Sequence, residues 1–387
     1  MVTKTTKFLS LGVLLTTVVA CSTLKVGDSN KRGQPAFIVN WVKPTYDQAF
    51  KVHRKMNRMT PLVVGDLVIQ GNNLEDLVAY KRKNGREVWR KTYKGGVEAG
   101  AVEFKDRLYV TTNDGTVEAV ELKTGKSLWS FPTSSENVSA PVLDSQTGFL
   151  YFQNAQNMVF CIDAESGKQV WIYSKNDATL LTIRGAATPT VGKGLIYVGF
   201  SDGSFVALKA TNGQVMWDLG LNRNKKFRDI DAQAVIYKDL VIVSGYDDKV
   251  YAIDSSKGTV IWSYPAGSYV AVTIVNDQLY AGTTNGTVLK LKADSGELIW
   301  TYAEVKGTPT QVVVYGDYLF FGESEGKLKA LNAADGKFVS SFEPGRGVFS
   351  RPYVDEAKSE IYFISGEAYL YNLKFFKNSA QSFSFIK

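Results

Sequence analysis

The chain has 387 residues, of which 44% are hydrophobic and 21% charged, so it can bury a large core and lacks the composition of a disordered protein. Its formal net charge of +7 suits an acidic partner or an anionic surface but is too diffuse to indicate nucleic acid. Two cysteines and one histidine exclude a disulfide framework and a histidine-built metal centre.

The first 20 residues have the pattern of an export signal. Lys4 and Lys7 precede a mostly apolar run at residues 8–20, and small or branched residues stand directly before Cys21. This run is shorter than the roughly 20 residues that a membrane-spanning helix needs, so a permanent transmembrane anchor is disfavoured. The segment resembles bacterial lipoprotein signals, which implies removal of residues 1–20, a lipid on Cys21 and a linker over residues 21–35. In such signals an acidic residue after the cysteine commonly retains the protein at the inner membrane, so Ser22 suits passage to the outer membrane.

A Gly-x-x-x-Trp motif recurs through most of the chain. Its tryptophans are Trp89, Trp129, Trp171, Trp217, Trp262 and Trp300, which lie 40, 42, 46, 45 and 38 residues apart. Two strand patterns joined by a tight turn precede each glycine. A period of this length predicts four-stranded propeller blades. The tryptophans are predicted to be structural, packing between blades and donating the indole N–H to a backbone carbonyl.

The two ends of the chain decide the number of blades. A seventh copy has Ser340 where tryptophan is expected, and the three strand patterns that follow it lack an outer strand. Trp41 lies in a strand pattern near the N-terminus that has no hairpin before it. We therefore predict an all-β, eight-bladed propeller of four-stranded antiparallel blades over residues 36–374, closed by the N-terminal strand, with a tail at residues 375–387.

Unequal loops indicate where recognition occurs. The connections that enter blades 1, 4 and 5 are 17 to 20 residues long, against 7 to 12 in the other blades. The second of these contains Leu181, Ile183 and Arg184, and the third contains Asp229 and Asp231. The aliphatic residues form either an exposed anchor or a plug of the channel mouth with Arg184 paired internally. Two carboxylates fall short of the oxygen ligands that calcium takes, so no metal is predicted.

Catalytic motifs are absent from the sequence. His53 lies in a basic stretch, and Cys161 lies in an apolar run typical of a buried thiol. Neither a nucleophile elbow nor a phosphate-binding loop is present. We therefore predict no catalytic residue and no cofactor.

The repeat resembles two known families. The pattern from Val250 to Trp262 is similar to the repeats of pyrroloquinoline-quinone-dependent dehydrogenases, but those enzymes are longer, and many use a disulfide of adjacent cysteines that this chain lacks. The chain also resembles, over its whole length, the outer-membrane assembly lipoprotein family BamB, which has a lipoprotein signal, eight such repeats and no cofactor. A quinoprotein dehydrogenase and a cell-wall or polysaccharide-binding propeller are the alternatives to this second family.

The BamB resemblance implies roles for specific residues. The segment with Leu181, Ile183 and Arg184 is similar to a family motif in the loop before the fourth blade, and Asp229 with Asp231 is similar to the motif in the next long loop. In the family these loops support docking onto the POTRA domains of the barrel assembly protein BamA. The resemblance implies a non-enzymatic scaffold that is a monomer within the barrel assembly complex and is lipid-anchored at the periplasmic face of the outer membrane. Its implied role is to assist the folding and insertion of outer-membrane proteins, and unfolded outer-membrane proteins are possible further partners.

Overall fold

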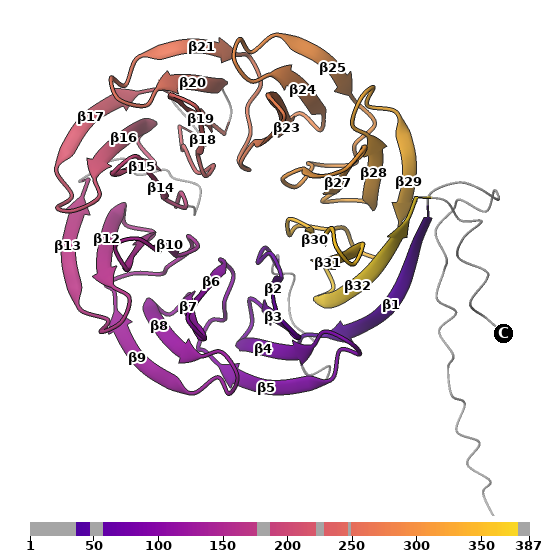
Figure 1. Cartoon of the computed structure of the whole chain (residues 1–387), viewed down its shortest axis with the longest axis horizontal. Helices are drawn as coiled ribbons and strands as arrows, with labels where there is room; N and C mark the ends of the chain where they lie inside the picture. Colours follow the sequence, from indigo (N-terminus) through magenta and orange to yellow (C-terminus); the bar gives the residue numbers. More distant parts are fainter. Residues whose placement is uncertain (1–35, 47–56, 176–185, 222–227, 247–248, 378–387) are drawn as a thin grey trace, which may run out of the picture.

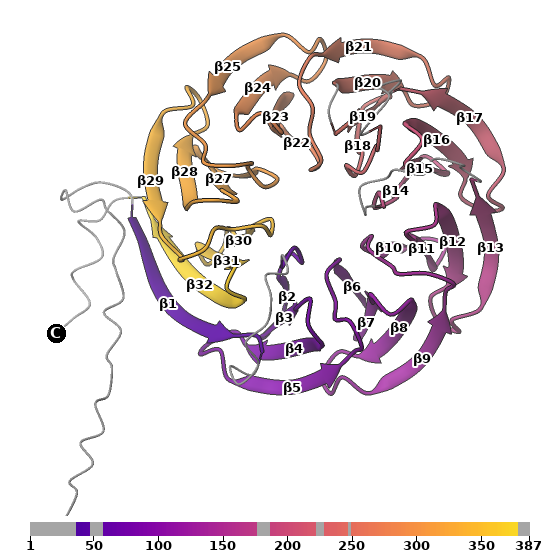
Figure 2. The same ribbon diagram turned by 180° about the vertical axis from the view of Figure 1, so that it is seen from behind.

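The computed structural model describes residues 36–46, 57–175, 186–221, 228–246 and 249–377. These residues form eight four-stranded antiparallel sheets arranged around a central axis (Figure 1; Figure 2). The predicted fold class is confirmed. No helix long and apolar enough to cross a membrane occurs in the described ranges.

Each blade runs outward from a short inner strand at the channel to a second strand. The inner strands are β2 (Leu62–Val64), β6 (Ala101–Phe104), β10 (Val142–Asp144), β14 (Thr190–Gly192), β18 (Val235–Tyr237), β22 (Thr273–Val275), β26 (Val313–Tyr315) and β30 (Tyr353–Asp355). The second strands are β3 (Leu67–Gly71), β7 (Arg107–Thr111), β11 (Phe149–Gln153), β15 (Leu195–Gly199), β19 (Leu240–Ser244), β23 (Gln278–Gly282), β27 (Tyr318–Gly322) and β31 (Glu360–Ile364).

A third strand and an outer strand complete each blade. The third strands are β4 (Asp76–Lys81), β8 (Thr116–Glu121), β12 (Met158–Asp163), β16 (Ser204–Lys209), β20 (Val250–Asp254), β24 (Val288–Lys292), β28 (Leu328–Asn332) and β32 (Tyr369–Phe376). The outer strands are β5 (Glu87–Thr92), β9 (Ser127–Pro132), β13 (Gln169–Ser174), β17 (Val215–Gly220), β21 (Val260–Tyr264), β25 (Leu298–Tyr302), β29 (Phe338–Phe342) and β1 (Ala36–Pro44).

The core lies between the blades. The second and third strands are almost continuously buried because each sheet packs face to face against its two neighbours. One cluster joins Val159 and Cys161 of blade 3 to Ile196 and Val206 of blade 4. Burial raises the pKa of the Cys161 thiol to about 12, so this cysteine behaves as the small hydrophobe that its sequence context indicates.

Neighbouring blades are joined by a contact between an indole ring and a turn glycine. Seven glycines adopt φ between 65° and 72°, and a Cβ added to any of them would lie 2.6 to 2.8 Å from an atom of the preceding blade's tryptophan. The pairs are Trp41 with Gly85, Trp89 with Gly125, Trp129 with Gly167, Trp171 with Gly213, Trp217 with Gly258, Trp262 with Gly296 and Trp300 with Gly336. Glycine is thus required both for the left-handed backbone and for the space that the ring occupies.

The predicted indole hydrogen bonds form in five of the seven tryptophans. Trp171 Nε1, for example, donates to the carbonyl oxygen of Ala210 in the next blade at 2.9 Å. The buried Nε1 atoms of Trp262 and Trp300 have no hydrogen-bond partner, which differs from the prediction. At Trp300 the corresponding carbonyl, that of Ala333, accepts instead from Lys290 Nζ at 2.9 Å.

The missing tryptophan in blade 7 has a structural explanation. Blade 8 takes its third strand, β32, from the C-terminal end and its outer strand, β1, from the N-terminal end. It therefore has no turn between these strands and no glycine for a tryptophan to cover. Ser340 is buried at this position, and the seam beside it is packed by Phe37, Phe320 and Phe375.

The pairing of β1 with β32 closes the ring. It extends from Ala36 opposite Phe376 to Pro44 opposite Tyr369. The propeller therefore continues beyond the predicted boundary at residue 374, since Phe375 and Phe376 belong to β32 rather than to a tail. A charged cluster adds to the closure: Arg82, after β4, contacts Asp355 at 2.5 Å and Glu360 at 2.6 Å in blade 8.

Replacement of Trp171 by alanine tests the indole–glycine contact. The side chain is 8% exposed and covers Gly213, so we expect Trp171→Ala to lower the free energy of unfolding by about 3–5 kcal/mol through lost burial and a residual cavity. Val170, its neighbour, is 42% exposed, and Val170→Ala should stay within about 0.5 kcal/mol of wild type. Denaturant unfolding measures both, and equal losses would contradict the assigned role.

Candidate functional site

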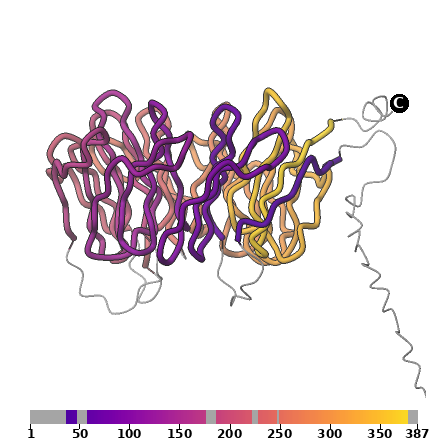
Figure 3. The backbone as a smooth tube through the Cα atoms, turned by 90° about the horizontal axis from the view of Figure 1, so that it is seen from below, coloured from indigo at the N-terminus to yellow at the C-terminus, as the bar shows by residue number. Residues whose placement is uncertain are grey.

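The strand order gives the ring two distinct faces (Figure 3). Because strands within a blade are antiparallel, the loops that enter each inner strand lie on the same face as the turns between second and third strands. We call this the entry face. The Gly-x-x-x-Trp turns lie on the opposite face, which we call the turn face. The described ends of the three expanded loops therefore lie on the entry face, around the channel mouth.

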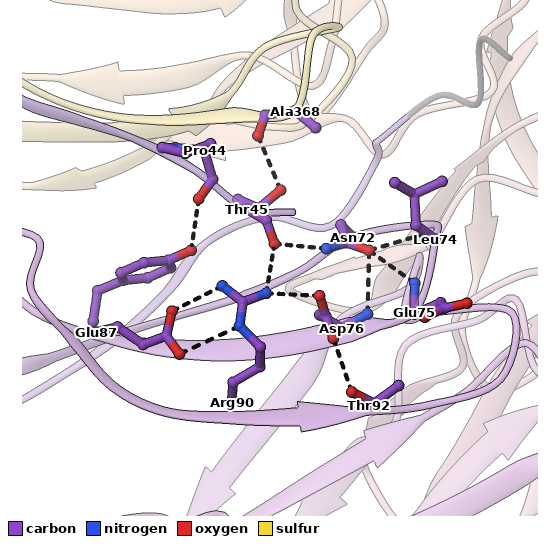
Figure 4. A network of polar contacts seen from close by, with 11 residues as sticks. Pro44, Thr45, Asn72, Leu74, Glu75, Asp76, Glu87, Arg90, Thr92 and Ala368 are labelled. Atoms are coloured by element: carbon purple, nitrogen blue, oxygen red, sulfur yellow. Dashed lines mark hydrogen bonds and ion pairs between the residues drawn. The ribbon is translucent and has the colours of Figure 1, made fainter. Parts of the chain in front are cut away.

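The start of the first expanded loop is fixed at the junction of blades 8 and 1 (Figure 4). The amide and hydroxyl groups of Thr45 donate to the Ala368 carbonyl at 3.0 and 2.9 Å. The Thr45 carbonyl accepts from Asn72 Nδ2 at 2.8 Å and from Arg90 at 3.1 Å. Tyr80 donates its hydroxyl to the Pro44 carbonyl. The chain consequently leaves β1 along one path.

Arg90 and Asn72 are themselves held in place (Figure 4). The Arg90 guanidinium contacts Asp76 at 2.6 Å and Glu87 at 2.8 Å. Asn72 Oδ1 accepts hydrogen bonds from the backbone N–H groups of three successive residues, the last of which is Asp76. Contacts within blade 1 therefore hold Arg90 and Asn72 in place, and the loop that they anchor is not needed for this.

The end of the same loop is anchored on blade 1. Asn57 and Met59 are 3% and 1% exposed, and Asn57 Oδ1 accepts from the Asn73 amide at 3.2 Å. The Met59 carbonyl accepts from Gln70 Nε2 at 3.2 Å. Arg58, between these two buried residues, is exposed. Two anchors on either side of Arg58 fix its backbone at the channel mouth. His53 lies outside the described residues.

The third expanded loop is anchored by Ile230. This side chain is fully buried, and its amide donates to the Phe200 carbonyl at 3.2 Å. Asp229 and Asp231, on either side of it, lie on the entry face as the sequence predicted. The Asp229 carbonyl accepts from the Tyr246 amide at 3.2 Å, which ties the loop to blade 5.

Electrostatics connect the first and third loops across the channel. Burial, reinforced by the negative charge of Asp229, raises the pKa of Asp231 to about 7, while the positive charge of Arg58 opposes this rise. Burial also raises the pKa of Tyr269 in the loop entering blade 6; its hydrogen bond with Thr308 and the Arg58 charge oppose the shift. Figure 1 places β2 and β18 on opposite sides of the channel, so Arg58 acts across the mouth.

The remaining predicted site residues fall outside the described ranges. These are Leu181, Ile183 and Arg184 of the second expanded loop, and the lipidation candidate Cys21. The described end of that loop is fixed, since Ala187 is buried and Thr188 Oγ1 accepts from the Ala140 amide at 3.2 Å. In the sequence, Arg58 belonged to a basic stretch interpreted as a solvated loop, and no local pattern indicated Tyr269.

The described part of the site has the chemistry of a polar docking surface. It brings together Arg58, which is exposed, with Asp231 and Tyr269, which are partly buried, above the fully buried Asp229. Groups of three or more His, Cys, Asp or Glu side chains suited to a metal ion do not occur within the described ranges.

The perturbed Asp231 carboxyl predicts a pH-dependent stability. Its folded-state pKa of about 7 exceeds the ordinary value of 3.8, so the folded chain keeps a proton that the unfolded chain has released between these values. The free energy of unfolding should therefore fall as pH rises through this window, by on the order of 2 kcal/mol after allowance for solvent screening. Asp231→Asn should remove this decrease.

Urea unfolding at pH 5 and pH 8 measures the effect. Asp294→Asn, at an exposed carboxyl beside the turn-face Gly296, provides the control and should leave the wild-type pH dependence intact. An identical pH dependence in wild type and Asp231→Asn would contradict the assignment.

Comparisons with known proteins agree with this architecture. The family profile described as outer membrane protein assembly factor BamB matches residues 73–302 and 238–378. A BamB from Moranella endobia is 25% identical over 261 residues, which cover 63% of this chain and 66% of that relative. The aligned region thus spans just under two thirds of the relative's length.

Solved structures share the fold. BamB from Moraxella catarrhalis superimposes with a TM-score of 0.74 at 18% identity, covering 88% of this chain and 100% of that one. A quinohemoprotein alcohol dehydrogenase from Pseudomonas putida gives a TM-score of 0.73 at 13% identity, covering 87% and 76%. These likenesses show a common propeller. The match of the family profile to more than half of the sequence shows that this chain belongs to the outer membrane protein assembly factor BamB family.

Proposed function

We propose that this protein is a non-enzymatic scaffold of the outer-membrane β-barrel assembly machinery, docking on the periplasmic POTRA domains of a BamA-like protein. The observation that carries the proposal is the match of the BamB family profile to residues 73–302 and 238–378. The sequence supports it with the two loop motifs, one containing Arg184 and the other Asp229 and Asp231.

The geometry of the entry face supports a docking role. Ile230, Asn57 and Met59 are buried anchors that hold the flanking polar residues in fixed positions. A surface that is ordered before binding loses little conformational entropy when a partner docks. Asp229 is fully buried beneath the surface, whereas Asp231 is partly exposed and provides the carboxyl group that a basic patch on the partner could contact.

The expected cellular location follows from the N-terminus. In this proposal residues 1–20 are removed, Cys21 carries the lipid, and the protein is held at the periplasmic face of the outer membrane. The propeller begins at Ala36, the first residue of β1, on the rim of blade 8. In this proposal residues 21–35 link the lipid to Ala36, which lies at the turn-face end of β1 and thus away from the entry face.

Substitutions in the two loops test the docking site. At pH 8, where Asp231 is ionised, Arg184→Ala and Asp231→Ala should each weaken binding to the POTRA domains of the same organism's BamA-like protein by about 10-fold or more, because truncation of one partner of an interface charge contact costs about 2 kcal/mol or more. Asp294→Ala, at an exposed carboxyl beside the turn face, should bind like wild type. Calorimetric titration with the purified full chain measures all three affinities.

Two results would contradict the scaffold proposal. One is wild-type protein that does not bind the POTRA domains at all. The other is turnover: addition of pyrroloquinoline quinone with calcium, followed by dye-linked oxidation of alcohols or sugars, would identify a dehydrogenase instead.

A further inference from the structure

The outer rim of the ring carries exposed hydrophobic side chains. All twelve large hydrophobic residues that are exposed in the described part of the chain lie on outer strands. Six of them directly precede the motif tryptophan, as Ile261 precedes Trp262. The register of β20 and β21 skips Ile261, so it is the unpaired residue of a β-bulge. The position directly before the tryptophan is thus placed at the surface by a bulge that belongs to the repeat itself.

A second exposed position does not follow the repeat. The residue two places before the tryptophan is Glu87, Ser127 or Gln169 in blades 1 to 3. In blades 4 to 7 the corresponding residues are Val215, Val260, Leu298 and Phe338, with exposures of 42%, 43%, 43% and 53%. The propeller tolerates polar residues here, so its fold does not require the change. The four strands follow one another along the rim in Figure 1, and we call these four residues the rim sector.

The strands of the rim sector also have open edges. Every outer strand ends its sheet, so the N–H and C=O groups on its outer side have no strand partner among the described residues. In blade 1 this edge is charged: Glu87 and Arg90 form an ion pair at 2.8 Å, and Lys91 follows. Charges of this kind are a usual protection of edge strands. The strands β21, β25 and β29 contain no charged residue, and neither do β9 and β13. What distinguishes β21, β25 and β29 is that an uncharged edge is combined with the exposed apolar residue of the rim sector.

We propose that the rim sector binds an extended, uncharged polypeptide segment with apolar side chains at alternate positions, which adds as a fifth strand to β21, β25 or β29. The open edge supplies backbone hydrogen bonds, and the apolar side chains select the partner's apolar face. The absence of charge complements a segment that has none, whereas the charged edge of β5 would reject it. The proposal rests on the proposed function in one respect: unfolded outer-membrane strands are the segments of this chemistry that the machinery handles.

The two binding surfaces do not compete for space. Each outer strand begins at the turn face and ends at the entry face. Val215 is the first residue of β17, and Asp229 lies in the loop that follows the strand's last residue, Gly220. A six-residue strand spans about 20 Å. A segment on the rim and a partner on the entry face can therefore be bound together.

Binding of a labelled peptide tests the rim sector. The probe is a fluorescent twelve-residue peptide of alternating valine and threonine, titrated against the full chain in lipid nanodiscs. Because β21, β25 and β29 offer separate edges, we expect the combined Val260→Lys, Leu298→Lys and Phe338→Lys variant to weaken binding about 10-fold, since a charge at each edge opposes strand addition. Ser127→Lys and Gln169→Lys, at the same place in blades 2 and 3, are matched controls and should stay within about 2-fold of wild type. Melting temperatures verify that the combined variant and both controls fold.

A second measurement separates strand addition from loose hydrophobic contact. Bound peptide should slow backbone amide exchange in β21, β25 or β29 and leave β5 unchanged. Equal affinity in all variants, or absence of binding to wild type, would overturn the proposal. Peptide binding that appears only after deletion of residues 378–387 would also overturn it, by identifying the chain's own C-terminal segment as the occupant.

The outcome is separable from that of the proposed function. Arg184→Ala lies outside the rim sector and should bind the peptide like wild type. Peptide binding without POTRA docking would contradict the scaffold proposal alone, and docking without peptide binding would contradict the rim proposal alone.

Discussion

The fit of an indole ring over a left-handed glycine is the contact on which the rest of this molecule depends. It recurs at seven blade junctions, and at each one a Cβ would overlap the ring. The turn needs glycine for its backbone angle, and the neighbouring blade needs the same glycine for space, so one residue satisfies two constraints. Trp262 and Trp300 keep the contact although their buried N–H groups have no partner. The packing of the ring, rather than its hydrogen bond, is therefore the essential part.

Fixed junctions explain why recognition can reside in loops. Blades that cannot move relative to one another hold residues from distant parts of the sequence in a constant relation. Arg58 acts on Asp231 across the channel mouth because both segments are anchored on rigid blades. The ion pairs of Arg82 and the hydrogen bonds of Thr45 likewise fix blade 8 against blade 1. Without them the start of the first expanded loop would lose its anchor.

The sequence was sufficient for the features that repeat. The spacing of glycine and tryptophan predicted the blades, and Trp41 predicted closure by the N-terminal strand. Features without a period could not be obtained this way. The last residues of β32 pair only with β1 at the other end of the chain, so nothing local showed that Phe375 and Phe376 belong to the ring. The relation of Arg58 to Asp231 likewise depends on a ring geometry that no sequence window contains. The absence of tryptophan at Ser340 needed the structure to explain it, because the cause is a turn that blade 8 does not have.

The raised pKa of Asp231 supports the proposed docking role, because this carboxyl group does not serve stability. A carboxylate removed from water beside a second, fully buried carboxylate lowers the stability of the fold, which is why its pKa rises. At the position of Asp229, whose carbonyl accepts from the Tyr246 amide, the loops entering blades 2 and 6 have glycine: the Gly96 and Gly267 carbonyls accept from the Asn113 and Thr284 amides in the same way. A neutral residue at this position would therefore destabilise the fold less than the buried carboxylate that is present. Carboxyl groups with perturbed pKa values cluster at functional sites, which makes Asp231 a candidate for the proposed docking site. The rim sector, at the turn-face end of the outer strands, is a second departure of this kind, because apolar residues are exposed where the repeat accepts polar ones. Both departures occur in blades 4 to 7 or in the loops that enter them.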